Sequence, residues 1–169
     1  MNKFFVSLIL IVTLLATLIV SAHASERYIK RSFDVGAYAP VVRIDHALYT
    51  WTMQESPKGT LGWGKGSGAN FIVLPTDAKG WYVIREFTSD HYQRVLTYTE
   101  SGFRMEYPKT DKYGMPVIDK TQMFRFHWYD TTKCGGKTVK NCWRLFCRAN
   151  GIAFCTGGWS TVHIYQINA

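Results

Sequence analysis

Acidic residues are scarce in this chain of 169 residues, which has twelve Asp and Glu against twenty Lys and Arg. The formal net charge is +8 at neutral pH. Such an excess favours partners of negative charge, such as a sialylated glycan, an acidic lipid headgroup or an acidic protein surface. Nucleic acid is not expected among them, because the N-terminal sequence predicts export.

Long apolar runs are absent after the first residues, so no later segment is expected to insert stably into a membrane. The N-terminal run "FFVSLILIVTLLATLIV" follows Lys3 and precedes Ala22 and Ala24, which are placed as an A-x-A cleavage pattern. This order predicts a signal peptide over residues 1–24, with a retained anchor as the alternative. Removing it takes away Lys3 alone among the charged residues and leaves a net charge of +7. The protein is expected to be secreted, or periplasmic in a bacterium.

Cysteine is limited to four residues near the C-terminus, and none forms a C-x-x-C pair. That spacing does not favour zinc, and no metal site is expected. An even number in an exported protein predicts two disulfides. The local pairs Cys134–Cys142 and Cys147–Cys155 are favoured. If Asn150-Gly151 forms a two-residue hairpin turn, however, Cys147 lies opposite Phe154, and the second bond needs a bulge or an odd-length loop.

Helical periodicity is missing from every stretch of ten or more residues after the signal peptide. Short alternating runs separated by turn residues predict an all-β fold. We expect an N-terminal extension over residues 25–40 and one domain over 41–169. These runs are "VVRI", "LYTWTM", "NFIVL", "WYVIRE", "RVLTYT", "FRMEY", "FRFHW", "CWRLF", "IAFC" and "STVHIYQI".

The segment "DKTQMFRFHWYD" places Gln122 two residues ahead of Phe124 and begins a strand pattern with Phe124, Phe126 and Trp128 on one face. Hairpin turns recur around residues 56–59, 100–102 and 150–151. This plan, with a Gln and an aromatic at a junction, resembles the ricin-type β-trefoil with its Q-x-W signature. A small β-barrel or a sandwich is the alternative.

The resemblance implies that Gln122 fixes the junction through hydrogen bonds while Phe124 enters the core. It also implies sugar binding, but the usual galactose residues are missing, since their positions fall near Thr97 and Glu106 and near Arg144 and Cys155. The binding subunits of cytolethal distending toxins are similar degenerate trefoils, which engage cells through an aromatic patch. The chain resembles them in export, size and aromatic content.

Aromatic residues are the main indication of binding, with six Trp and ten Tyr. Trp51, Trp63, Trp81 and Trp159 lie beside turns or glycines, where exposure is easiest, although each also suits a core. A basic run accompanies the cysteines: Lys133, Lys137, Lys140, Arg144 and Arg148. We expect ligand binding by Trp63, Trp81, Tyr92, Trp159, Lys137 and Lys140.

Catalytic patterns are not found. His46, His91, His127 and His163 stand singly, and His46 next to Asp45 points to the opposite face of a strand. "CGGKT" lacks the glycine that a phosphate-binding loop requires. The expected function is therefore non-catalytic recognition of a cell-surface glycan or glycoprotein, as a toxin's accessory or delivery subunit, without a cofactor. An exported enzyme inhibitor is the alternative, and a small hydrolase is a third hypothesis.

Overall fold

The computed structural model describes residues 26–31, 39–88 and 93–167. The expected signal peptide, Tyr92 and His91 lie outside the described residues. The elements are β1 (Arg27–Tyr28), β2 (Val41–His46), β3 (Thr52–Glu55), β4 (Leu61–Gly64), β5 (Asn70–Pro75), β6 (Tyr82–Glu86), β7 (Val95–Thr99), β8 (Gly102–Glu106), β9 (Lys109–Thr110), β10 (Pro116–Val117), the 3₁₀ helix η1 (Lys120–Gln122), β11 (Phe124–Cys134), β12 (Lys137–Cys147) and β13 (Val162–Gln166).

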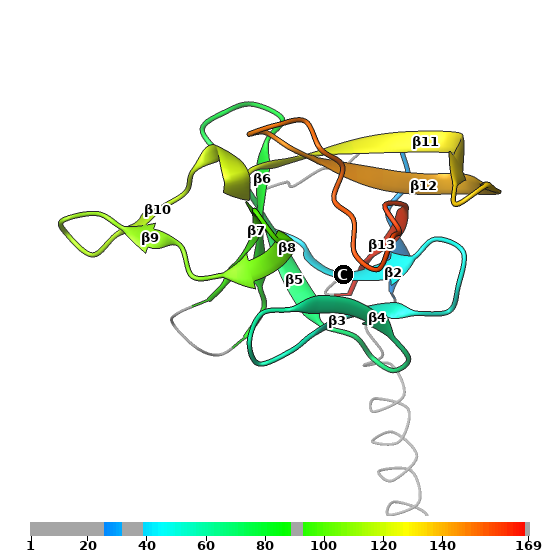
Figure 1. Cartoon of the computed structure of the whole chain (residues 1–169), viewed down its shortest axis with the longest axis horizontal. Coiled ribbons are helices and arrows are strands. Elements are labelled where there is room, and N and C mark those ends of the chain that lie inside the picture. The colour runs from blue at the N-terminus through cyan, green and yellow to red at the C-terminus, as the bar shows by residue number, and fades with distance from the viewer. Residues whose placement is uncertain (1–25, 32–38, 89–92, 168–169) are drawn as a thin grey trace, which may run out of the picture.

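Six antiparallel strands close into a barrel in the order β2, β5, β6, β11, β12 and β13 (Figure 1). Closure comes from β13, which pairs with β2 over five registered residue pairs. Two of the strand pairings in the barrel are short. Strand β6 pairs with β11 only through Tyr82 and Phe124, and β12 pairs with β13 only through Trp143 and Val162. The all-β prediction is confirmed, and the architecture is that of the barrel alternative rather than the sandwich.

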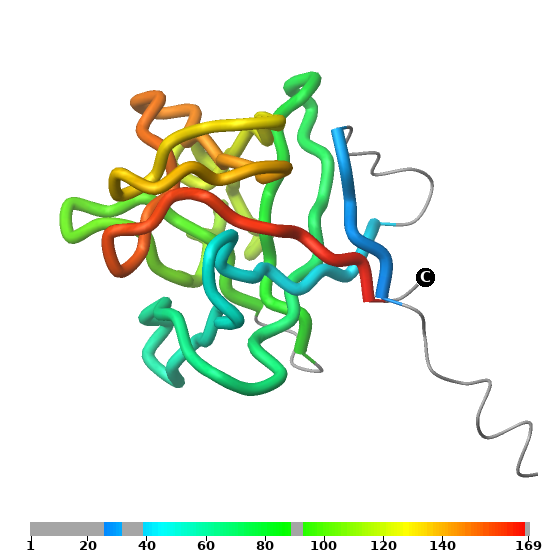
Figure 2. Tube along the Cα trace, turned by 90° about the vertical axis from the view of Figure 1, so that its right-hand side faces the viewer, coloured from blue at the N-terminus to red at the C-terminus, as the bar shows by residue number. Residues whose placement is uncertain are grey.

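Three of the connections between consecutive barrel strands are long and contain additional paired segments, whereas β5–β6 and β11–β12 are joined by short turns. The hairpin β3–β4 lies between β2 and β5, and β7–β8 lies between β6 and β11. Between β12 and β13 the chain makes isolated bridges from Phe146 to Ala153 and from Thr156 to Trp159. Strand β1, in the expected N-terminal extension, pairs with the end of β13 (Figure 2).

A small additional hairpin, β9–β10, projects from the barrel, and we call residues 107–118 the arm (Figure 1). The arm lies on the side of the barrel opposite to the turn of the β11–β12 hairpin. Its tip is held by Asp111, whose Oδ1 accepts hydrogen bonds from the backbone N–H of Tyr113 at 2.8 Å and of Met115 at 2.9 Å. Tyr113 and Met115 are nevertheless 77% and 62% exposed.

The core takes alternate residues from the barrel strands, because side chains of a strand change face at every residue. Phe124 is fully buried and Phe126 and Trp128 are half-buried, whereas Arg125 and His127 are exposed. The alternation predicted from the sequence is therefore confirmed. The hairpins β3–β4 and β7–β8 add Met53, Leu61, Leu96 and Met105 to the same core, and the β12–β13 connection adds Phe154.

Gln122 fixes the start of β11, as the resemblance implied. Its Oε1 accepts a hydrogen bond from Asp119 N at 3.3 Å, while Asp119 Oδ1 accepts one from Thr121 N at 2.7 Å. Together these bonds form a capping box around η1. Since Phe124 is 0% exposed, both roles expected of this junction are confirmed.

The predicted disulfides are not formed, and all four cysteines are free thiols. In the β11–β12 ladder Cys134 lies opposite Lys137 and Cys142 lies opposite Tyr129, so the two cysteines are not cross-strand partners, although both belong to one small buried cluster. The Cys147 thiol approaches the carbonyls of Lys120 and Thr121 instead of Cys155. Strand register therefore overrides the proximity of these cysteines in sequence.

The turn at Asn150-Gly151 is also longer than the two-residue turn expected. Cys147 N donates to Ile152 O, so four residues from Arg148 to Gly151 form the loop, and Cys147 does not lie opposite Phe154. A two-residue turn occurs instead at Gly135-Gly136, between β11 and β12, where both residues have positive φ. That conformation is easily adopted only by glycine, which explains the Gly-Gly pair in "CGGKT".

Candidate functional site

Five aromatic rings from separate parts of the chain gather at one place. His46 ends β2, Tyr49 and Trp51 lie in the β2–β3 connection, Trp63 is on β4, and Trp159 is in the turn at residues 156–159. We call these residues the aromatic cluster. The β2–β3 connection lies on the same side of the barrel as the turn of the β11–β12 hairpin (Figure 1).

His46 is the centre of the aromatic cluster. Its ring centroid lies 4.8 Å from that of Tyr49, 5.1 Å from that of Trp63 and 4.9 Å from that of Trp159. Tyr49 stacks on Trp51 at 4.8 Å with 30° between the planes. The four surrounding rings are half-buried, whereas His46 is 2% exposed. The cluster is therefore closely packed around His46, and its four outer residues are partly exposed to solvent.

Hydrogen bonds determine the tautomer of His46. Its Nδ1 accepts from the backbone N–H groups of Leu48 at 3.0 Å and Tyr49 at 3.3 Å, so Nδ1 carries no proton. Burial, together with the nearby His163, lowers the pKa of His46 and keeps the imidazole neutral. The proton then resides on Nε2, which is buried and has no hydrogen-bond partner among the described residues.

A cation stands beside these rings. Lys137 Nζ donates to Tyr49 Oη at 2.9 Å and lies 5.2 Å from the centroid of that ring. Lys137 is brought there by the Gly135-Gly136 turn, where a Cβ on Gly135 would lie 3.0 Å from the Trp159 ring. The turn thus packs against the cluster only because Gly135 has no side chain.

The structure brings together three of the six residues predicted to bind ligand, namely Trp63, Trp159 and Lys137. Trp81 is elsewhere, with the guanidinium groups of Arg125 and Arg148 at 5.3 and 5.6 Å from its ring centroid. Lys140 is exposed opposite Thr131 in the β11–β12 ladder. These two residues are therefore not part of the aromatic cluster, and Tyr92 lies outside the described residues.

His46, Tyr49 and Trp51 were absent from the predicted set. The sequence places them within six residues of one another, on both sides of a strand end, and that is the signal that could have identified them. As the sequence predicted, His46 forms no dyad with its neighbour. The Asp45 carboxylate instead accepts hydrogen bonds from Arg43 at 2.8 and 2.9 Å.

A second group of ionisable residues lies outside the cluster. Arg94 Nη2 is 2.8 Å from Glu55 Oε1 and 3.2 Å from Glu86 Oε1, so one guanidinium bridges two carboxylates. Burial raises the pKa of Glu55 to about 7, with a further contribution from the charge of Glu86, and this outweighs the attraction of Arg94. The three side chains tie β3 to β6 and to the start of β7.

Among the described residues, no His, Cys, Asp and Glu side chains gather in a group of three or more suited to a metal ion. Nor does this part of the chain contain a helix with the length and apolar character needed to cross a bilayer.

Comparison with known proteins finds no matching family and no matching curated protein. Among solved structures, the chain is similar to the lysenin pore, with a TM-score of 0.47 and 13% identity over 82% of this chain. It is also similar to lysenin in complex with phosphocholine, with a TM-score of 0.47 and 14% identity over 81%. The similar region spans 48% and 46% of those chains, which is less than half of their length.

Proposed function

We propose that this protein is an exported, non-catalytic recognition module that binds an anionic cell-surface glycan through the aromatic cluster. The main support for this proposal is that half-buried aromatic rings surround His46 and that the ammonium group of Lys137 lies beside them. Aromatic faces stack on the C–H groups of a sugar, and Lys137 supplies a charge partner for a carboxylate. His46 Nε2, at the centre of the same cluster, is a buried donor without a hydrogen-bond partner among the described residues.

Phosphocholine is a second ligand that this chemistry favours. A quaternary ammonium group binds to the faces of aromatic rings through cation–π attraction, and a neighbouring lysine attracts the phosphate. Tyr49, Trp51 and Trp159 provide such faces within one group of contacting rings. One of the similar structures also contains phosphocholine.

Binding assays on the full chain test the proposal. A glycan array that includes sialylated glycans, together with titration of phosphocholine, should show saturable binding by one of the two classes. Trp159→Ala and Lys137→Gln should each weaken it about tenfold, because one removes a ring and the other the cation. Trp81→Ala, a tryptophan outside the cluster, is the matched control and should change the affinity less than twofold.

Binding of neither ligand class, or equal loss in Trp81→Ala and Trp159→Ala, would contradict the proposal. A delivery role for a toxin predicts one further property. The protein should bind intact cells and bring a co-secreted partner to their surface, and Trp159→Ala should lose both effects together.

The proposal includes a β-trefoil as the architecture. Support comes from the barrel strands, which follow one another as β2 and β5, β6 and β11, β12 and β13, with an excursion inside each pair. Such a fold relates its three units by rotations of about one third of a turn. A high-resolution crystal structure in which the units do not superpose in this way would remove the trefoil and leave the barrel.

An exported enzyme inhibitor is the second candidate function, favoured by the arm. Its tip displays Tyr113 and Met115 on a turn that Asp111 holds in one conformation, as an inhibitory loop requires. Pull-down from extracellular extracts with the wild type and with Tyr113→Ala tests this function. An enzyme retained by the wild type and lost from Tyr113→Ala would favour it over glycan recognition.

A further inference from the structure

The outward face of the barrel strands β5 and β6 and of the adjoining strand β7 carries several apolar side chains. Val73, Ile84 and Leu96 belong to the core, so the residues next to them in each strand face away from it. These neighbours include Leu74, Val83 and Val95, together with the polar Arg85 and Thr97.

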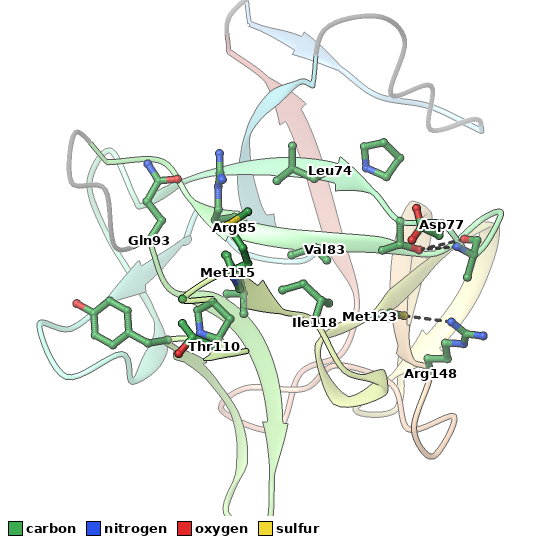
Figure 3. A pocket seen from close by; sticks show the side chains of 18 residues that line it. Leu74, Asp77, Val83, Arg85, Gln93, Thr110, Met115, Ile118, Met123 and Arg148 are labelled. Atoms are coloured by element: carbon green, nitrogen blue, oxygen red, sulfur yellow. Dashed lines mark hydrogen bonds between the residues drawn. The ribbon is translucent and has the colours of Figure 1, made fainter. Parts of the chain in front are cut away.

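A groove of about 1430 Å³ lies between this apolar surface and the arm (Figure 3). Leu74, Val83 and Val95 line it from the barrel, while Met115 and Ile118 line it from the arm. The volume exceeds the roughly 300–1,000 Å³ usual for a small-molecule site. Val83 and Val95 are only 5% and 2% exposed, so the arm already covers part of the surface and leaves the remainder as a groove.

Two arginines stand at this groove, Arg85 on β6 and Arg148 after β12 (Figure 3). Arg85 Nε is buried and has no hydrogen-bond partner, and neither guanidinium forms an ion pair within the described part of the chain. Arg148 Nη1 contacts Met123 Sδ at 3.1 Å, and a thioether is a weak acceptor. The exposed Asp77 is the acidic residue of the lining.

A buried cationic atom without a partner is unfavourable, and an anion would relieve it. We propose that the groove binds an amphipathic anion, with a single apolar chain along Leu74, Val83 and Val95 and a carboxylate or phosphate head at Arg85. Arg85 is the anchor because the guanidinium of Arg148 already rests on Trp81. This site is separate from the aromatic cluster and does not depend on its ligand.

Displacement of a fluorescent fatty acid from the full chain tests the proposal, with oleate and dodecyl phosphate as competing anions. Both should displace it saturably, while dodecyltrimethylammonium should compete at least tenfold more weakly. Arg85→Gln should reduce the affinity for both anions about tenfold. Met115→Glu adds a negative charge at a side chain that is 62% exposed, so it should weaken binding without affecting folding.

Lys58→Gln is the matched control, since it removes an exposed positive charge that does not line the groove and should leave affinity within twofold. Sedimentation with phosphatidylserine vesicles separates two sources of the head group. If Arg85→Gln loses both vesicle association and dodecyl phosphate binding, the ligand of the groove is a membrane lipid. If Arg85→Gln loses dodecyl phosphate binding alone, the ligand is a free amphiphile. Absence of saturable binding, or equal competition by the cationic amphiphile, would overturn the proposal.

Discussion

Gln122 Nε2 donates a hydrogen bond to Thr97 Oγ1 at 3.2 Å, and both side chains are buried. The same amide accepts from Asp119 N, so a single side chain connects η1 to β7 and sets the start of β11. Thr97 Oγ1 also donates to Val95 O at 3.0 Å, which directs the hydroxyl lone pairs toward Gln122. The junction is thus a short chain of buried hydrogen bonds between parts of the sequence that lie 25 residues apart.

Replacing Gln122 by Leu should lower the free energy of unfolding by about 1–3 kcal/mol, since it leaves the Asp119 N–H and Thr97 without their partner. Urea denaturation followed by far-UV circular dichroism measures this. Lys120→Ala in the same 3₁₀ helix is the control, because its side chain is exposed and a surface change of this kind stays within about 0.5 kcal/mol. Equal stability of the Gln122→Leu variant and the wild type would show that the junction does not depend on these bonds.

The cysteines should behave as thiols in protein purified without a reductant. Titration with a thiol reagent should modify Cys155, which is exposed, in the native state and reach Cys134, Cys142 and Cys147 only after denaturation. Added dithiothreitol should not change the melting temperature, because there is no cross-link to lose. A denatured protein without reactive thiols would instead support disulfides.

Burial of His46 should make stability depend on pH on the acidic side of neutrality. Since its pKa is lowered in the folded state, the unfolded chain binds more protons below the ordinary histidine pKa of about 6.5. Stability is therefore complete above that pH and is lost as the pH falls toward the folded pKa, by at most about 1.4 kcal/mol per unit. His46→Gln should show a shallower loss of stability below about pH 6.5 in thermal melts.

Titration of Glu55 should change the stability with pH in the direction opposite to that of His46. Its folded pKa of about 7 lies above the ordinary value of 4.5, so the folded protein binds the extra proton between these values and stability falls as the pH rises through them. Glu55→Gln removes this contribution, and its stability should increase more steeply with pH than that of the wild type. Glu100→Gln, at an exposed turn, provides a control that should follow the wild type.

Gly135→Ala should disturb the aromatic cluster as well as the β11–β12 turn. The added methyl group would meet the Trp159 ring at 3.0 Å, and the residue has a φ of +55°, which costs an L-residue about 1–2 kcal/mol. Gly136→Ala shares the strained backbone with a φ of +75° but has no atom near its Cβ, so it isolates the ring contact. Tryptophan fluorescence should change in Gly135→Ala and not in Gly136→Ala.

The sequence was sufficient to predict the strands and the junction at Gln122. Alternation from Phe124 to Trp128 identified the inward face of β11, because a half-buried strand must alternate whatever its partners are. The role of Gln122 was implied by the Q-x-W resemblance, and one of its two partners, Asp119, lies just ahead of that strand in the sequence. The cysteine pairs and the Asn150-Gly151 turn were wrong because both depend on register, which the partner strand determines.

The sequence by itself determined an all-β chain with excess positive charge and many aromatic residues, because alternation and composition are properties of neighbouring residues. Only the tertiary structure decided that Trp63, Trp159 and Lys137 meet around His46 while Trp81 does not. These side chains come from segments up to 113 positions apart, and their meeting depends on barrel closure by β13 and β2. Barrel closure joins segments that are distant in the sequence. The local sequence pattern therefore does not indicate which loops lie together at one end of the barrel.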